Sequence, residues 1–167
     1  NLLISDLIHP DSRIMMYRTV TQRVRQIAPF FKFDRDPYMV IDDECRLIWM
    51  LDGYTTTDRY PYSDPVPGIG NYIRNSVKVT IDAYDGTVTF YRADDSDPIV
   101  RAYGGAFPGL LKPLDQMPEA LRRHIRYPED FFAIQARKYA TYHMLDPQVF
   151  YNKEDLWALP RRVVEGR

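Results

Sequence analysis

The side chains best suited to acid–base chemistry are two groups of carboxylates, one of which lies close to a histidine in the sequence. Asp34 and Asp36 flank a single residue, and His124 is followed closely by Glu129 and Asp130. A histidine next to a carboxylate is a common arrangement for general acid–base catalysis, and two carboxyl groups about 5–10 Å apart can hydrolyse a glycosidic bond. If the fold brought these residues into one cleft, they would suit a hydrolase or a transferase.

The same residues also have structural interpretations. Asp36 precedes a proline, which is typical of a turn, and His124 and His143 flank an expected helix, where histidine often caps or packs. The acidic segments 34–36 and 94–97 could offer oxygen ligands, but neither has the spacing of an EF-hand loop. We therefore predict no catalytic residue, no cofactor and no metal site, and keep these positions as a candidate surface.

Motifs that usually identify an enzyme are absent from the sequence. There is no phosphate-binding glycine loop, no dinucleotide fingerprint, no nucleophile elbow and no zinc-protease histidine pair. Gly68-Ile69-Gly70 lies in a proline-rich stretch and does not open a helix, so it does not indicate a nucleotide site. Cys45 is the only cysteine, which excludes an intramolecular disulfide, and its acidic neighbours disfavour a reactive thiolate.

Tyrosine is unusually frequent, with 13 copies, and several of them lie in or beside a stretch rich in glycine and proline at 53–70. We predict a long loop there, bearing Tyr54, Tyr60 and Tyr62, with Tyr72 just beyond it. Tyrosine combines apolar area with a hydroxyl, which suits protein interfaces and glycan surfaces. The alternative is that these rings pack the loop onto the body of the domain.

Length and composition indicate one globular domain spanning residues 1–167. Apolar residues make up 45% and charged residues 27%, and 22 basic residues nearly balance 23 acidic ones. Without a strong positive field, nucleic acid is excluded as a partner. No apolar run reaches the roughly 18–20 residues that cross a bilayer. Because the chain begins at Asn1 without a signal sequence, we expect a fragment excised from a longer protein.

The first half predicts a helix followed by two hairpins. Apolar residues at helical spacing predict a helix over 11–28, starting at Asp11 or Ser12 and ending before Pro29. Two apolar runs around the acidic residues 42–44 predict the first hairpin.

The second hairpin is expected over 77–92, with Asp85-Gly86 as a two-residue turn that places Ile81 opposite Phe90. In this register Val79 and Ile81 share a face with Phe90, and the opposite face is polar with tyrosines.

The second half, 97–160, is predicted to be mostly helical. Asp97-Pro98 opens one short helix that Gly104-Gly105 would end, and prolines at 118 and 128 open two more, over 118–124 and 128–142. The predicted fold class is therefore α+β, an antiparallel sheet of about four strands from two hairpins, with helices packed on one face.

Short stretches along nearly the whole chain are similar to those of one group of proteins; they lie at 12–18, 23–30, 34–38, 49–57 (WMLDGYTTT), 60–63, 71–78, 82–88, 124–130 (HIRYPED), 142–144 and 150–157 (FYNKEDLW). Together they resemble uncharacterised protein family UPF0182, large bacterial proteins with several N-terminal membrane helices and a long extracytoplasmic region. The resemblance implies that this chain is a middle piece of that region. It implies no catalytic or binding residue.

From the resemblance and the missing motifs we expect a non-catalytic interaction or structural domain in the extracytoplasmic part of a membrane protein. Its expected partners are other parts of the parent protein or cell-envelope components. One alternative is a domain that binds or processes an envelope glycan or lipid through a carboxylate–histidine site, and another is a calcium-stabilised spacer. The candidate surface comprises Asp34, Asp36, Tyr54, Tyr60, Tyr62, Tyr72, His124, Glu129 and His143.

Overall fold

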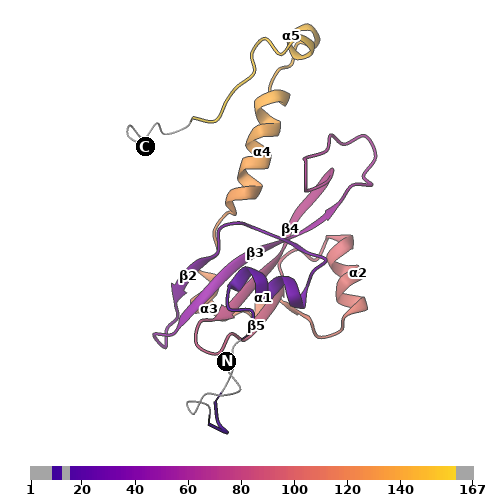
Figure 1. Cartoon of the computed structure of the whole chain (residues 1–167). Helices are drawn as coiled ribbons and strands as arrows, with labels where there is room; N and C mark the ends of the chain where they lie inside the picture. Colours follow the sequence, from indigo (N-terminus) through magenta and orange to yellow (C-terminus); the bar gives the residue numbers. More distant parts are fainter. Residues whose placement is uncertain (1–8, 13–15, 161–167) are drawn as a thin grey trace.

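The computed structural model describes residues 9–12 and 16–160, and it confirms the α+β class (Figure 1). A six-stranded sheet forms the body of the molecule, and helices surround it. The strands are β1 (Lys32–Phe33), β2 (Tyr38–Ile41), β3 (Leu47–Thr57), β4 (Tyr72–Asp82), β5 (Val88–Arg92) and β6 (Leu111–Pro113). The helices are α1 (Val20–Ile27), α2 (Pro98–Ala106), the 3-10 turn η2 (Leu114–Gln116), α3 (Glu119–Arg122), α4 (Glu129–Tyr142) and α5 (Pro147–Asn152).

The sheet is built around the long antiparallel pair β3 and β4, with the order β1-β3-β4-β5-β6 and with β2 also pairing β3. Both predicted hairpins are present, as β2–β3 and β4–β5. The sheet has six strands rather than four because two short strands join its edges. Of these, β6 pairs with β5 in parallel. Such short strands carry too little alternation to be recognised in a sequence.

The register of the second hairpin differs from the prediction by two residues. Ile81 pairs with Val88 and Val79 with Phe90, because the connection is longer than a two-residue turn. Asp82 closes it from both sides, since its amide donates to the Thr87 carbonyl at 3.0 Å and its carbonyl accepts from Gly86 at 3.0 Å. A shift of two residues keeps every side chain on its predicted face. The predicted apolar face is therefore correct although the register was wrong.

One face of the sheet is covered by α1 and α2. Val79 and Phe90 from the sheet pack there with Val24 of α1 and Val100 of α2, and all four are buried. Asp97 fixes α2 in place, because its fully buried carboxylate caps the helix at Ile99 and accepts hydrogen bonds from hydroxyls of β3 and β4.

The other face is also covered, which corrects the prediction of helices on one face only. Met50 and Tyr91 pack there against Met117 and Leu121, which follow β6 in the chain. This polar-looking face additionally holds the cross-strand pair Asp52 and Lys78, whose ion pair is almost completely buried. A paired charge can be buried where a lone one cannot, so the sheet faces cannot be assigned by polarity alone.

The N-terminal helix is shorter than predicted. The expected start at Asp11 or Ser12 is wrong, because α1 begins at Val20 and the Thr19 hydroxyl accepts its capping hydrogen bond from Gln22 at 3.3 Å. Residues 13–15 of the expected helix lie outside the described residues. A helix requires a capped start as well as apolar spacing, and here Thr19 provides it.

The predicted loop at 53–70 starts later than expected, because β3 continues to Thr57. Threonine favours strands, and this run of threonines extends the pairing with β4. The register shifts at Tyr54, since Gly53 pairs with Val77 whereas Thr55 pairs with Arg74. Such a bulge redirects side chains near it. Tyr54 is therefore a strand residue and not a loop residue.

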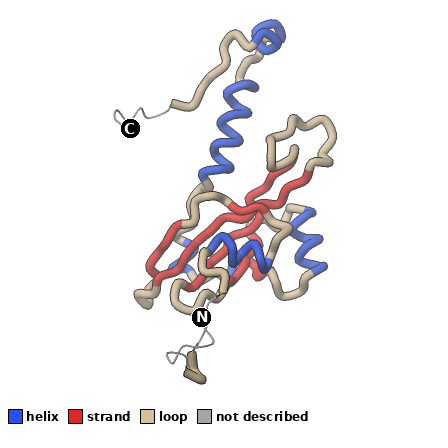
Figure 2. Tube along the Cα trace, viewed as in Figure 1, coloured by secondary structure: helices blue, strands red, loops and turns tan. Residues whose placement is uncertain are grey.

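The helices of the second half form largely where expected. Asp97 caps α2, but the helix continues through both glycines to Ala106 instead of ending at Gly104-Gly105. Helix α4 matches its predicted range, and a further helix, α5, begins at the proline after Asp146. Neither α4 nor α5 contains a buried residue. They rise away from one end of the sheet, beside the loop of residues 58–71 (Figure 2).

Candidate binding surface along helix α4

The base of α4 is fixed to the sheet by a buried carboxylate. Asp34 is only 2% exposed and accepts hydrogen bonds from the Tyr54 hydroxyl, from the Asp130 amide at 3.0 Å and from the Asp36 amide at 2.9 Å. The Asp130 amide belongs to the first turn of α4, where helix N–H groups lack partners and the helix dipole favours a negative charge. Asp34 thus acts as a distant cap that joins the helix to the strands.

Tyr54 completes this joint. Its side chain is 1% exposed and its ring stacks on Phe131 of α4, with centroids 6.0 Å apart. Burial raises the pKa of the Tyr54 hydroxyl well above its ordinary value, and the hydrogen bond to Asp34 raises the pKa further. The hydroxyl is therefore held as a proton donor to the carboxylate and not as a base.

Ion pairs surround the buried joint on its solvent side. The Arg35 guanidinium contacts Asp130 through Nη2 at 2.5 Å and Nε at 2.8 Å, and the hydrogen bond with the Asp130 carboxylate raises the pKa of Arg35. Asp36 pairs with Arg126, whose guanidinium also lies 3.9 Å from the centre of the Tyr38 ring. These carboxylates therefore have cationic partners already.

A cleft of about 780 Å³ lies between the 58–71 loop and α4, higher along the helix. Tyr60 and Tyr72 stack on each other in its wall, with centroids 5.5 Å apart and an interplanar angle of 24°. Burial raises the pKa of Tyr72, and its hydroxyl donates a long hydrogen bond of 3.4 Å to Asp97. Six aromatic side chains line the cleft; they are Tyr60, Tyr62, Tyr72, Phe131, Tyr139 and Tyr142.

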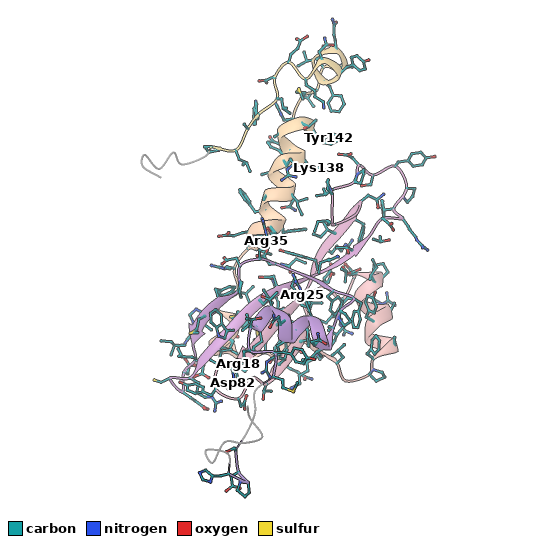
Figure 3. All side chains as sticks on the ribbon, viewed as in Figure 1. Arg18, Arg25, Arg35, Asp82, Lys138 and Tyr142 are labelled. Atoms are coloured by element: carbon teal, nitrogen blue, oxygen red, sulfur yellow. The ribbon has the colours of Figure 1, made fainter. Side chains whose placement is uncertain are left out.

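The loop that forms one wall of this cleft is held by its own hydrogen bonds. The Asn71 side chain accepts from the Tyr60 amide at 3.0 Å and donates to the Tyr60 carbonyl at 2.6 Å. Gly70 has a φ of +110°, and a Cβ there would lie 2.5 Å from the Thr57 carbonyl oxygen, so only glycine fits. Lys138 on α4 then pairs with Asp64 across the cleft, and Figure 3 shows Lys138 and Tyr142 on this helix.

Beyond the cleft, the helix tip is packed mainly on itself. His143 stacks on Trp157 with centroids 3.9 Å apart, and its Nε2 lies 3.3 Å from an Asp155 carboxylate oxygen. The Trp157 amide donates to the Ala140 carbonyl at 3.3 Å, so the tail folds back on α4. We call residues 129–160, comprising α4, α5 and this tail, the arm.

The model of one family covers nearly the whole chain. Residues 1–166 match the description "Uncharacterised protein family (UPF0182)". This chain belongs to the UPF0182 family. It is 57% identical to a UPF0182 protein of Pelotomaculum thermopropionicum over 97% of its own length, and 55% identical to one of Geobacter sp. (strain M21) over 95%. A UPF0182 protein of Cupriavidus necator is 56% identical over 98% of the chain. No solved structure matches.

The UPF0182 chain spans 18% of the length of each of these three relatives. The part of the chain that the structure describes contains no helix long and apolar enough to span a membrane.

The structure brings some sequence-predicted residues of this UPF0182 chain together and leaves others apart. Asp34, Asp36 and Tyr54 meet at the base of α4, and Tyr60, Tyr62 and Tyr72 line the cleft.

The remaining three candidates are His124, Glu129 and His143. Glu129 is exposed in the first turn of α4, and His143 lies at the opposite end of this helix. The His124 side chain is exposed, and only its backbone carbonyl contacts Tyr38. The expected carboxylate–histidine constellation therefore does not converge. Within residues 9–12 and 16–160, no group of three or more metal-ligating side chains is assembled either.

One feature of this surface was missed in the sequence. A second groove, of about 660 Å³, adjoins the cleft at Ile134 of α4 and is lined by Arg25, Lys32, Arg35 and Arg137, with Asp130 as its one acidic residue. These cations come from α1, β1, the segment after β1 and α4. These four residues do not form a run of basic residues in the sequence, so only the folded chain shows that their side chains converge.

Proposed function

We propose that this chain is a non-catalytic interaction domain of a longer UPF0182 protein, and that its arm packs against another segment of the same polypeptide. The supporting observation is the exposure of large apolar side chains on the arm. They are Phe132, Tyr139, Tyr142, Leu145, Phe150, Tyr151, Leu156, Trp157 and Leu159, each at least 37% exposed. Large apolar patches on a protein surface usually mark an interaction site.

The length of the relatives points to the occupant. Because the chain matches only 18% of each relative, most of a UPF0182 polypeptide lies outside the residues aligned here. A covalently linked segment has a high effective concentration near the arm, so it competes well against separate proteins. Tyr139 and Tyr142 also line the aromatic cleft, so the cleft and the outer surface of the arm form one continuous contact area.

The state of the acidic residues favours a binding role over catalysis. A general base needs a free lone pair that faces a substrate. Asp34 is buried and receives three hydrogen bonds, while Asp36 and Asp130 are paired with arginines. The geometry therefore uses these carboxylates to attach α4 to the sheet.

The interaction can be tested by photo-crosslinking in the full-length protein that contains this chain. A photoreactive amino acid replaces Phe132 or Tyr151 on the arm, and Tyr84 on the distant β4–β5 connection is the control, since all three side chains are exposed. We expect the two arm positions to give intramolecular cross-links to segments outside this chain, identified by mass spectrometry. Cross-links only to other proteins, or yields equal to those of Tyr84, would contradict the proposal.

We further propose that the domain lies outside the cytoplasm, as its family resemblance suggests. Cys45 offers a direct test because it is the only cysteine of the chain and is exposed. In a full-length variant whose other cysteines are replaced, a membrane-impermeant maleimide should label Cys45 in intact spheroplasts. Labelling that appears only after the membrane is permeabilised would place the domain in the cytoplasm. A Cys45→Ser variant controls for labelling elsewhere.

A further inference from the structure

The groove of about 660 Å³ beside α4 concentrates positive charge on a chain whose net charge is −1. Arg25 and Lys32 approach it from α1 and β1, and Arg137 approaches it from α4. Arg35 also lines the groove, but Asp130 neutralises it. Figure 3 shows Arg35 near the foot of α4 and Arg25 below it, on α1.

The three other cations have no acidic partner among the described residues. Their side chains form neither an ion pair nor a hydrogen bond there, although most arginines of the body, such as Arg46, Arg74 and Arg126, are paired with aspartates. Like charges that face one cavity repel each other, and a bound anion relieves this repulsion.

The floor of the groove is apolar. Phe31 and Phe33 are almost completely buried beneath it, and Pro67 and Ile134 form parts of its walls. Apolar walls lower the local dielectric constant and strengthen the attraction between a bound anion and the surrounding cations. The groove is also large enough for a small organic ligand.

We propose that this groove binds a phosphate-bearing ligand. A phosphate group carries up to about two negative charges near neutral pH, so one or two phosphates balance three cations, whereas a single carboxylate does not. Arginine presents a planar fork of donors that matches phosphate oxygens, and lysine adds a flexible point charge. The ligand is a soluble phosphate compound or a phospholipid head group, since both present the same chemistry.

A purely structural role explains only part of this arrangement. Arg25 lies in the last turn of α1, where a cation offsets the helix dipole. That role does not account for Lys32 on a strand or for Arg137 on a different helix, both exposed and both facing the same groove. The convergence from three elements is what a shared anion explains.

The test is calorimetric titration of the protein with inorganic pyrophosphate at low ionic strength. The charge-reversal variant Arg25→Glu/Arg137→Glu should bind at least about tenfold more weakly, because two charge-assisted contacts are lost and two repulsions are gained. The matched control is Arg101→Glu/Arg122→Glu, which reverses two exposed arginines away from the groove and should change the dissociation constant less than about twofold. Melting temperatures confirm that each variant is folded. The milder Lys32→Gln variant, which should also weaken binding, serves if the double variant is unfolded.

Two further arms identify the source of the phosphate. Binding to phosphatidylcholine vesicles that contain phosphatidic acid, reversed by pyrophosphate, would assign a lipid head group. Binding of pyrophosphate without vesicle binding would assign a soluble ligand. The proposal is overturned if neither probe binds, if citrate binds as tightly as pyrophosphate, or if the control variant loses as much affinity as the groove variant. Anion binding by the groove and cross-linking of the arm are separate measurements, so failure here and failure of the proposed interaction are distinguishable.

Discussion

The sheet body and the arm differ in whether their large apolar side chains are buried or exposed to solvent. In the body, apolar residues on both faces of the sheet are buried, and the buried charged residues are either paired, as Asp52 and Lys78 are, or held by several hydrogen bonds, as Asp34 is. In the arm, α4 and α5 bury no residue of their own, and Met144 between them, which is 8% exposed, is the one buried apolar side chain. The body therefore has a buried core on each face of its sheet, whereas the arm presents an apolar surface that water disfavours.

The transition between these two regions is sharp and lies at Asp34. There the helix is tied to the strands by buried hydrogen bonds and by the stack of Phe131 on Tyr54. Farther along the helix, Lys138 pairs with Asp64 of the 58–71 loop, and the Ala140 carbonyl accepts a hydrogen bond from the tail. Most helical stability in proteins comes from packing of an apolar face, so an exposed helix depends on what it contacts. The contrast predicts that equivalent substitutions have different effects in the two regions.

The largest difference is expected between two leucines. Leu51 is 1% exposed in the centre of β3, and Leu145 is 93% exposed beyond α4. Leu51→Ala should lower the free energy of unfolding by about 2–5 kcal/mol, because it removes buried methyl groups and leaves a cavity. Leu145→Ala should change it by less than about 0.5 kcal/mol. Urea denaturation of the isolated chain measures both, and similar losses for the two variants would contradict the division into body and arm.

The next effect concerns the joint itself. Asp34→Ala leaves the Tyr54 hydroxyl and the Asp130 amide without their acceptor, at an expected cost of about 1–3 kcal/mol for each buried donor left unsatisfied. Amide hydrogen exchange should rise first in the first turn of α4 and then in the strands. The matched control is Asp36→Ala, which removes an ion pair whose aspartate is 38% exposed and should cost less than about 1 kcal/mol. If the two variants are equally stable, Asp34 is not the anchor of the helix.

The joint should also make the protein sensitive to alkali. The native pKa of Tyr54 is raised, so the native state keeps this proton at a pH where the unfolded state has released it. The stabilisation is complete below the ordinary tyrosine pKa of about 10 and is lost as the pH rises above it, by up to about 1.4 kcal/mol per pH unit. Unfolding free energies measured from pH 8 to pH 11 should show this decline. The Tyr54→Phe variant lacks the titrating group, so its decline should be smaller; an identical decline would assign the effect to other residues.

Local patterns predicted many of the helices and strands but little of the surface. The two hairpins, the cap at Asp97 and helix α4 follow from apolar alternation, turn residues and prolines that act over a few positions. The start of α1 was wrong because apolar spacing does not reveal which residue caps a helix, and the hairpin register was wrong because Asp82 closes a longer turn. The basic groove joins residues more than 100 positions apart, from Arg25 to Arg137, and no local rule predicts that distance.

Tyr54 shows why local patterns do not predict the position of every candidate residue. Its stretch was predicted to be a loop because of the nearby glycines and prolines, with its ring either on a binding surface or packing the loop onto the body. The structure places it in a strand, at the register shift between β3 and β4, with its hydroxyl on Asp34. Bulges of this kind carry no strong sequence signal, although they determine where side chains point.

The smallest expected effect tests whether the aromatic cleft belongs to the body or to the arm. Lys138→Ala removes the ion pair with Asp64, and because both side chains are partly exposed, the free energy of unfolding should fall by less than about 1 kcal/mol. The effect on local opening should be larger than the effect on global stability, because Lys138 holds the loop against α4 and no strand joins these two segments. Hydrogen exchange should increase in both the 58–71 loop and α4 while β3 and β4 remain protected. Asn71→Ala, which removes the hydrogen bonds to Tyr60 within the loop, is the matched comparison and should loosen the loop without affecting α4. If Lys138→Ala leaves the loop protected, the cleft wall is held by the body alone, and only the far side of the arm remains available for the proposed contact.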